Sequence, residues 1–192
     1  MVTWQPIPLW DDDAWEGGAP DAPAPSPRET SSVSPQVGAR PIGVFDLETT
    51  GVDVREDRIV TAHVGLLDPD GTVLDARTWL ADPGVVIPEG ATAVHGITTA
   101  HARAHGRPAT EVIAEVTAAL RDLFARGIPV VAYNAPFDFS MLKYEGLRHG
   151  VAPIASPAPV IDPLVIDKTY DRYRRGKRTL EVVAAHYAVT LD

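Results

Sequence analysis

Residues 44–51 read Val-Phe-Asp-Leu-Glu-Thr-Thr-Gly, an apolar run that carries two acidic side chains and ends in glycine. In a β-strand, residues i and i+2 point to the same face, so Asp46 and Glu48 share one face and Leu47 points into a core. Like charges about 4 Å apart repel by roughly 4 kcal/mol at an effective dielectric near 20. A strand here therefore predicts a cation or a shifted pKa, unless the strand ends at Leu47 and water solvates both acids.

The kind of cation follows from the available donor atoms. The chain has no cysteine, which excludes disulfides, zinc-thiolate sites and thiol nucleophiles. Carboxylate oxygens favour Mg²⁺ or Mn²⁺ over zinc. If the acids hold a metal, we expect one of these two.

The surrounding pattern predicts an α/β fold. Strands are expected at 42–49, 58–67 and 72–80, and a helix at 110–126 with Thr110 as a possible N-cap and Gly127 as its stop. Further strands are expected at 128–133 and 160–162, and helices at 136–146 and 180–187. Three antiparallel strands followed by alternating helices and strands predict a mixed sheet flanked by helices.

Length and composition indicate one folded domain behind a polar tail. The chain has 192 residues, of which 45% are apolar and 22% charged, as in globular proteins. Residues 1–40 are rich in Pro, Ala and Ser with six acidic and two basic residues, so we expect a flexible acidic tail before a domain at 41–192. The formal charge of -9 does not attract nucleic acid, so such binding needs a local basic patch or a metal. Signal-peptide and membrane-spanning patterns are missing, and we expect a cytoplasmic protein without membrane contact.

A third acid, Asp138, lies in the segment Asn-Ala-Pro-Phe-Asp-Phe at 134–139, where a strand is followed by a helix. By itself, an acid in a first helical turn often only complements the helix dipole. Together with residues 45–51, however, residues 134–142 resemble the DEDD exonuclease superfamily, whose members resemble the proofreading epsilon subunit of bacterial DNA polymerase III. Ala-Val-His-Gly-Ile-Thr at 93–98 resembles another family segment, and the resemblance covers about residues 41–192.

This resemblance implies an RNase H-like fold and a metal-dependent 3′–5′ exonuclease that hydrolyses the 3′-terminal phosphodiester of nucleic acid, as in DNA repair or proofreading. Asp46, Glu48 and Asp138 would be the catalytic residues and the ligands of two Mg²⁺ or Mn²⁺ ions, with Asp46 bridging them. Two ions about 4 Å apart would stabilise the attacking and leaving oxygens. The substrate would be single-stranded DNA, or alternatively RNA.

The same resemblance assigns substrate contacts to Thr49, Thr50, His95, Asn134 and Phe137. The two threonines would contact the terminal nucleotide, although β-branched residues also simply fill strands. His95 would lie near the 3′ end, but a histidine before a glycine turn is as often structural. Asn134 would hydrogen-bond its loop, and Phe137 would pack beside the terminal base.

The last family motif, a His-x-x-x-x-Asp that supplies the general base and a fourth acid, does not occur after Asp138. His186 lacks an acid five positions on, and we interpret the earlier match of His63 with Asp68 as chance. Residues 178–187 resemble the helix that precedes this motif, which predicts a domain truncated before it. Losing a general base costs about 10²- to 10⁴-fold in rate, so we expect impaired hydrolysis. The alternative is a non-catalytic nucleic-acid-binding or interaction module on the same fold.

Two further segments suggest partners. Residues 168–178 contain six basic residues and two tyrosines, which would either bind phosphates and stack on bases or form a solvated loop. These residues are Lys168, Tyr170, Arg172, Tyr173, Arg174, Arg175, Lys177 and Arg178. The segment Gln-Pro-Ile-Pro-Leu-Trp at 5–10 resembles peptides that dock on sliding clamps, which makes a clamp or polymerase partner a further hypothesis.

Overall fold

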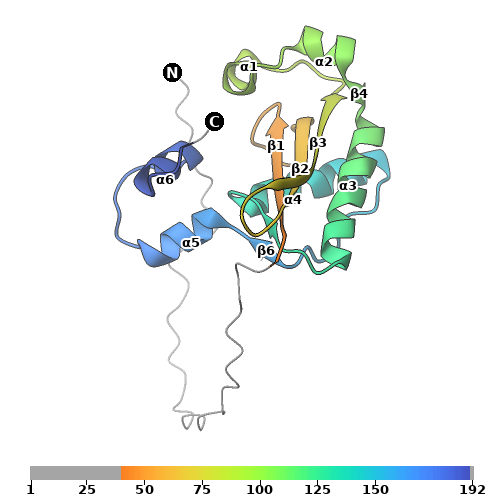
Figure 1. Cartoon of the computed structure of the whole chain (residues 1–192). Helices are drawn as coiled ribbons and strands as arrows, with labels where there is room; N and C mark the ends of the chain where they lie inside the picture. The colour runs from red at the N-terminus through yellow and green to blue at the C-terminus, as the bar shows by residue number, and fades with distance from the viewer. Residues whose placement is uncertain (1–39, 191–192) are drawn as a thin grey trace, which may run out of the picture. The chain divides into compact units, whose positions relative to one another are not determined.

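The computed structural model describes residues 40–190, which form a mixed β-sheet with helices packed on it (Figure 1). The strands are β1 (Ile42–Thr49), β2 (Ile59–Leu67), β3 (Val73–Asp82), β4 (Arg107–Pro108), β5 (Val130–Val131) and β6 (Val160–Ile161). The helices are α1 (Glu89–His95), α2 (Thr99–His105), α3 (Ala109–Ala125), α4 (Ala135–His149), α5 (Pro163–Tyr170) and α6 (Leu180–His186).

The six strands lie in the order β4-β3-β2-β1-β5-β6. β1, β2 and β3 pair antiparallel, whereas β5 pairs parallel with β1 and β6 pairs parallel with β5. The predicted α/β fold, with three antiparallel strands followed by parallel ones, is confirmed. This order places β1 next to β5, so that the helix after β5 starts beside the end of β1.

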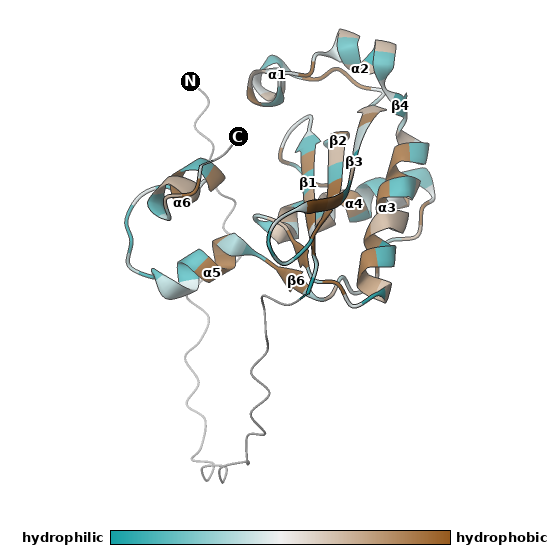
Figure 2. Ribbon diagram, viewed as in Figure 1, coloured by the Kyte–Doolittle hydropathy of each residue, from teal (hydrophilic) through white to brown (hydrophobic). Residues whose placement is uncertain are grey.

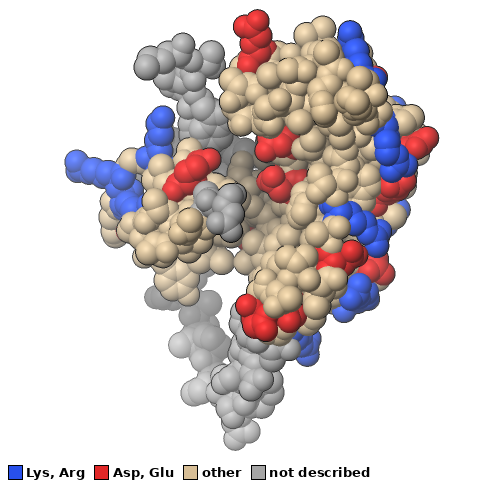
Figure 3. Space-filling model, turned by 45° about the horizontal axis from the view of Figure 1, so that its top comes forward, with Lys and Arg blue, Asp and Glu red and all other residues tan. Residues whose placement is uncertain are grey.

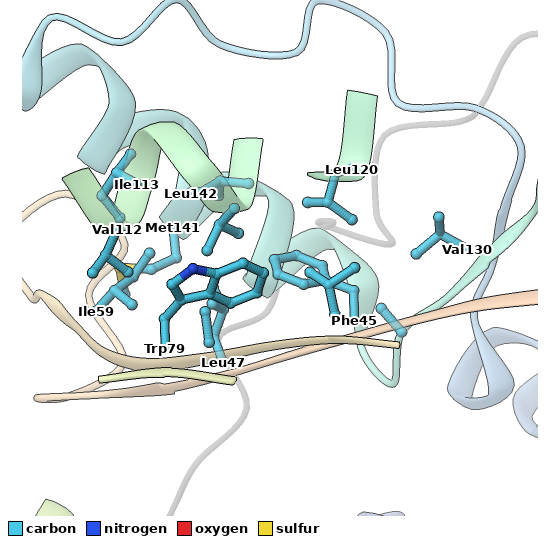
Figure 4. Close-up of a cluster of buried hydrophobic side chains, with 14 of the residues drawn as sticks. Phe45, Leu47, Ile59, Trp79, Val112, Ile113, Leu120, Val130, Met141 and Leu142 are labelled. Carbon is cyan, nitrogen blue, oxygen red and sulfur yellow. The ribbon is translucent and has the colours of Figure 1, made fainter. Parts of the chain in front are cut away.

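The main core lies between one face of the sheet and helices α3 and α4 (Figure 4). Phe45 and Leu47 point into it from β1, where they meet Trp79 of β3 and Leu120 of α3. α3 buries residues at three-and-four spacing along one side, which is the amphipathic pattern that the sequence predicted. Apolar residues also run along the central strands (Figure 2).

Two predicted helices differ from the prediction at one end, α3 at its start and α4 at its finish. α3 begins after Pro108 without a side-chain cap, so the predicted Thr110 cap is wrong, whereas the predicted stop at Gly127 has a left-handed φ of 67°. α4 continues past Gly146, which is buried within the helix. A side chain is excluded at this position, because a Cβ there would lie 2.9 Å from the Val151 carbonyl oxygen. Gly146 therefore allows close packing and does not terminate the helix.

Three helices, α1, α2 and α5, were not predicted from the sequence. α1 has no buried residue and α2 buries only Ala102, so neither shows an apolar stripe. α5 begins with Asp162 as the N-cap and Pro163 as the first helical residue, which is a recognisable start signal. The expected strand at 128–133 is confined to the two residues of β5.

The structure does not test the predicted tail. Residues 1–39 and the clamp-like segment at 5–10 lie outside the described residues. Across residues 40–190, no helix combines the length and the apolar character needed to cross a membrane.

Candidate active site

β1 presents Asp46 and Glu48 on one face, as the alternating pattern predicted. Asp46 is exposed and Glu48 is half-buried, whereas Leu47 between them is buried in the core. In the antiparallel ladder Asp46 lies opposite His63 of β2. The strand does not end at Leu47, because β1 continues to Thr49.

Asp138 reaches the same region from the first turn of α4. The backbone before this turn is fixed, because Asn134 is left-handed (φ 60°, ψ 44°) and the amides of Asn134 and Ala135 each donate to the Asp162 carboxylate at 3.0 Å. Asp138 is 4% exposed, and the Leu47 backbone amide lies near enough to lower its pKa. The start of α4 thus carries its acid against β1.

Burial opposes the ionisation of all three acids, and the charge of Asp46 also opposes the ionisation of Glu48 and Asp138. Burial raises the pKa of Asp138 to about 8, the Asp46 charge adds to the rise, and the backbone amides of Asp138 and Leu47 oppose it only in part. Partial burial also raises the pKa of Asp46, which the Leu47 amide and His63 partly offset. Burial and then the Asp46 carboxylate raise the pKa of Glu48.

These acids receive no cation from the protein side chains. Within residues 40–190, no ion pair involves Asp46, Glu48 or Asp138. Nor do any three His, Cys, Asp or Glu side chains in this range converge closely enough to hold a metal ion. Figure 3 shows acidic side chains in a recess near the centre of one face. The three carboxylates supply the oxygen donors that Mg²⁺ prefers, and they lie in one region without converging on a single point.

The loop after β1 uses the polar groups of Thr50. Thr50 is buried; its hydroxyl donates to Asp57 Oδ1 at 2.9 Å and accepts from the Arg58 amide at 3.0 Å, and its own amide donates to the Arg58 carbonyl at 2.9 Å. These polar groups of Thr50 are therefore hydrogen-bonded within the protein, and its substrate contact stays a prediction. Gly51 is required here because a Cβ would collide with the Asp57 carboxylate. The Thr49 hydroxyl donates to the Gly51 carbonyl at 2.6 Å and is only half-buried.

His95 lies beside the end of β1, although it is far from it in sequence. It ends α1, before a left-handed Gly96, and its Nδ1 accepts from the Ile97 amide at 3.1 Å. Burial lowers the pKa of His95, and the nearby Thr49 backbone offsets this shift only in part. Its Nε2 is buried and has no hydrogen-bond partner among the described residues. The segment at 93–98 therefore adjoins the site.

The two residues predicted from the second motif have mainly structural contacts. Asn134 forms the left-handed turn before α4, and its backbone, not its side chain, makes the hydrogen bond to Asp162. Phe137 is partly buried and packs against the main core. The packing of Phe137 beside a terminal base stays a prediction.

Asp162 is a site-organising residue that the sequence analysis missed. It caps α5 through the Leu164 amide at 2.9 Å while it holds the two amides that precede α4. Its charge also adds to the raised pKa of Asp138. An Asp between a short strand and Pro163 is an N-cap signal that could have revealed it.

Neither histidine considered as a general base forms the family motif. Asp68 accepts amide hydrogen bonds from Asp70 and Thr72 at 3.1 and 3.0 Å, so it serves the turn after β2 and is not a partner of His63. The Nε2 atom of His186 lies 3.4 Å from Asp171 Oδ2, on the α5–α6 side of the chain.

The basic segment at 168–178 contains both exposed residues and residues that form ion pairs inside the protein. Arg174 and Arg178 are 15% and 13% exposed and form ion pairs with Asp167, which is 1% exposed. The Tyr187 hydroxyl also donates to Asp167, at 3.2 Å. Two of the six predicted phosphate-binding residues are therefore used inside the protein.

A family model described as exonuclease, of the RNase T type, matches residues 44–192. The chain belongs to this exonuclease family. The match includes both acidic motifs and confirms the resemblance inferred from residues 45–51 and 134–142. The nuclease family and the nucleic-acid-binding class of the chain follow from it.

Curated relatives of this exonuclease-family chain are much longer. The PolC-type DNA polymerase III of Streptococcus thermophilus is 28% identical over 150 residues, which cover 78% of this chain and 10% of the polymerase. The DNA polymerase III subunit epsilon-like protein of Rhodobacter capsulatus is 38% identical over 109 residues, covering 56% of this chain and 15% of that protein. The chain thus spans only about a tenth of the PolC-type polymerase it matches.

Solved structures share the fold. E. coli exonuclease I in complex with a 5cy-dT13 oligonucleotide aligns with a TM-score of 0.66 and 20% identity, over 80% of this chain and 37% of that one. A product-bound exonuclease I aligns with a TM-score of 0.64 and 19% identity, over 79% of this chain and 39% of that one. The RNase H-like fold expected for an exonuclease of this family is thereby confirmed.

Proposed function

We propose that this exonuclease domain is a metal-dependent 3′–5′ exonuclease that removes the 3′-terminal nucleotide of single-stranded nucleic acid. The observation that carries this proposal is the grouping of Asp46 and Glu48 on β1 with Asp138 on α4: burial raises the pKa of all three, the Asp46 charge adds to the rise at the other two, and none of them forms an ion pair within residues 40–190. A protein keeps uncompensated acids together at a cost in stability, which an external cation removes.

Asp46, Glu48 and Asp138 are the proposed ligands of Mg²⁺ or Mn²⁺. Protonation of buried Asp138, whose pKa is raised, relieves part of its repulsion with Asp46. When bound, two such ions supply charge neutralisation and water activation at the scissile phosphate. Asp162 positions the turn that carries Asp138, and Thr49 and His95, which lie near each other, are the proposed contacts of the terminal nucleotide.

The rate of hydrolysis depends on a general base that these residues do not supply. After Asp138 the sequence contains no histidine with an acid five positions on, and His186 lies beside Asp171. We infer that the 192-residue chain hydrolyses its substrate about 10²- to 10⁴-fold more slowly than an enzyme with a general base. The same observation favours a second candidate function, a module that binds nucleic acid without turnover.

The proposed substrate is single-stranded DNA, with RNA as the alternative, and the proposed setting is DNA repair or proofreading in the cytoplasm. The exonuclease I structures hold single-stranded oligonucleotides, and the curated relatives are DNA polymerase III proteins. These relatives motivate the hypothesis of a polymerase partner, whereas the hypothesis of a sliding-clamp partner rests on residues 5–10 alone.

The test is a Mg²⁺-dependent digestion of a 5′-labelled single strand. The expected result is a ladder of products that shorten stepwise from the 3′ end, which EDTA stops. Asp46→Ala should lower the rate at least about 100-fold, because the metal contributes several kcal/mol to the transition state. Asp75→Ala, which removes an exposed acid from β3, is the matched control and should keep the rate.

Equal digestion by the wild-type chain and Asp46→Ala would show that the activity comes from a contaminant. Tight binding of the strand without any shortening would instead support the binding module. Internal fragments at early times would contradict an exonuclease.

A further inference from the structure

Two tyrosines at the end of α5 are almost completely exposed. Tyr170 is 85% exposed and Tyr173 is 88% exposed, the highest values among the exposed large hydrophobic side chains of residues 40–190. Exposing a large aromatic ring twice within four residues is unusual for a surface that binds nothing.

The basic side chains around these tyrosines also face the solvent. Lys168, Arg172, Arg175 and Lys177 are exposed, and none of them forms an ion pair in the described part of the chain. Figure 3 shows basic side chains projecting from the lobe that contains α5 and α6. A protein with a formal charge of -9 thus carries a cluster of positive charge with exposed rings inside it.

An internal ion-pair network holds this surface in place. Asp167 accepts from both Arg174, at 2.5 Å, and Arg178, and the Arg178 guanidinium donates to the Asp171 and Arg174 carbonyls at 2.5 and 3.1 Å. These inward contacts tie the two ends of the loop together. The residues between them are left on the outside.

The same loop is connected to the acidic site. The Tyr133 hydroxyl, at the end of β5, donates to the Arg178 carbonyl at 2.6 Å. Tyr133 immediately precedes Asn134, the turn residue before α4 and Asp138. The loop is therefore attached, through Tyr133, to the turn that precedes Asp138.

We propose that Lys168, Tyr170, Arg172, Tyr173, Arg175 and Lys177 form a binding platform for single-stranded nucleic acid. The tyrosines stack on bases and the four basic side chains contact phosphates. The platform rests on the proposed function in one respect only, that the strand bound here continues to the acids. An acidic protein, as the alternative partner, would bind to the basic side chains without needing the tyrosine rings. The test therefore asks whether the tyrosines contribute to binding.

The test measures binding of two oligonucleotides in EDTA by fluorescence anisotropy: a labelled dT10 and an abasic strand with the same number of phosphates. The wild-type chain should bind dT10 about ten times more tightly than the abasic strand. Tyr170→Ala with Tyr173→Ala should remove this preference, and the conservative pair Tyr170→Phe with Tyr173→Phe should restore it. Because EDTA excludes metal and hydrolysis, a failure of the proposed nuclease activity does not alter these results.

The charges are tested by salt dependence. Arg172→Ala with Arg175→Ala should lower the slope of log affinity against log salt by about 1.4, at about 0.7 for each phosphate contact of a single strand. Arg126→Ala, directly after α3, is the control and should keep the slope. Equal affinity of the wild-type chain for dT10 and the abasic strand, or an unchanged preference in the tyrosine-to-alanine pair, would overturn the proposal.

Discussion

Asp138 and Asp167 are both acids in the protein interior, but their surroundings differ. Asp138 is 4% exposed and Asp167 is 1% exposed. Burial disfavours the charge of Asp167, but Arg178, Arg174 and the Tyr187 hydroxyl hydrogen-bond to it and lower its pKa. Asp138 has no such cation, and its pKa rises to about 8.

This difference separates structural acids from acids kept for a ligand. The chain compensates Asp167 fully, with two arginines from the same loop, and thereby fixes α5 to the residues before α6. At Asp138 it adds the like charge of Asp46 instead. An interior acid placed beside another acid either stays protonated, with a raised pKa, or is compensated by a cation from outside the protein.

The largest predicted effect is on the compensated side. Asp167→Ala leaves Arg174 and Arg178 partly buried without their acid, and should lower the melting temperature by roughly 5 to 10 °C. Asp122→Ala breaks the exposed ion pair with Arg126 and should change it by less than about 2 °C. Thermal melts followed by circular dichroism check both. Equal losses in the two variants would contradict the assigned role of Asp167.

The uncompensated side should respond in the opposite direction. Asp138→Asn keeps the shape of the side chain but removes the buried charge, so at pH 8 without metal it should raise the melting temperature by roughly 3 to 6 °C. Addition of Mg²⁺ should stabilise the wild-type chain and not this variant. A loss of stability in metal-free Asp138→Asn would show that the charge is compensated within the protein.

The two acids also predict opposite pH dependences. The pKa of Asp138 is higher in the folded state, at about 8 against an ordinary 3.8, so the folded state binds the extra proton and loses stability as pH rises through this window. The pKa of Asp167 is lowered, so its contribution is present above its ordinary pKa and is lost as pH falls through the folded value. Without metal, stability should be greatest near pH 4 to 5 and should fall by at most about 1.4 kcal/mol per pH unit toward pH 8. Urea titrations in EDTA between pH 4 and 8 measure this; stability that rises toward pH 8 would contradict it.

The fold was predictable where apolar residues recur at a regular spacing and where turn-forming residues mark the ends of the elements. β1 matches its predicted range completely, because alternation places Phe45 and Leu47 in the core. α1 and α2 were missed because they bury almost nothing, and Gly146 was misjudged because its reason is a contact with Val151. Such tertiary contacts leave no local pattern in the sequence.

The site was predictable only where it depends on a local sequence pattern. Alternation alone brings Asp46 and Glu48 to one face, whereas the approach of Asp138 depends on the pairing of β5 with β1. The use of Thr50 by the Asp57 loop and the double role of Asp162 are visible only in the folded chain. The inward turn of Arg174 and Arg178 likewise could not be read from a run of basic residues.

The most direct measurement is calorimetric titration of the metal-free chain with Mn²⁺ at pH 7, in buffers of different ionisation enthalpy. We predict binding that releases protons, because Asp138 with a pKa of about 8 must lose its proton to become a ligand. Asp46→Asn, Glu48→Gln and Asp138→Asn should each weaken binding at least about tenfold, and Asp138→Asn should also reduce the proton release. Binding that is unchanged in all three variants, or no binding by the wild-type chain, would contradict a shared cation at these acids.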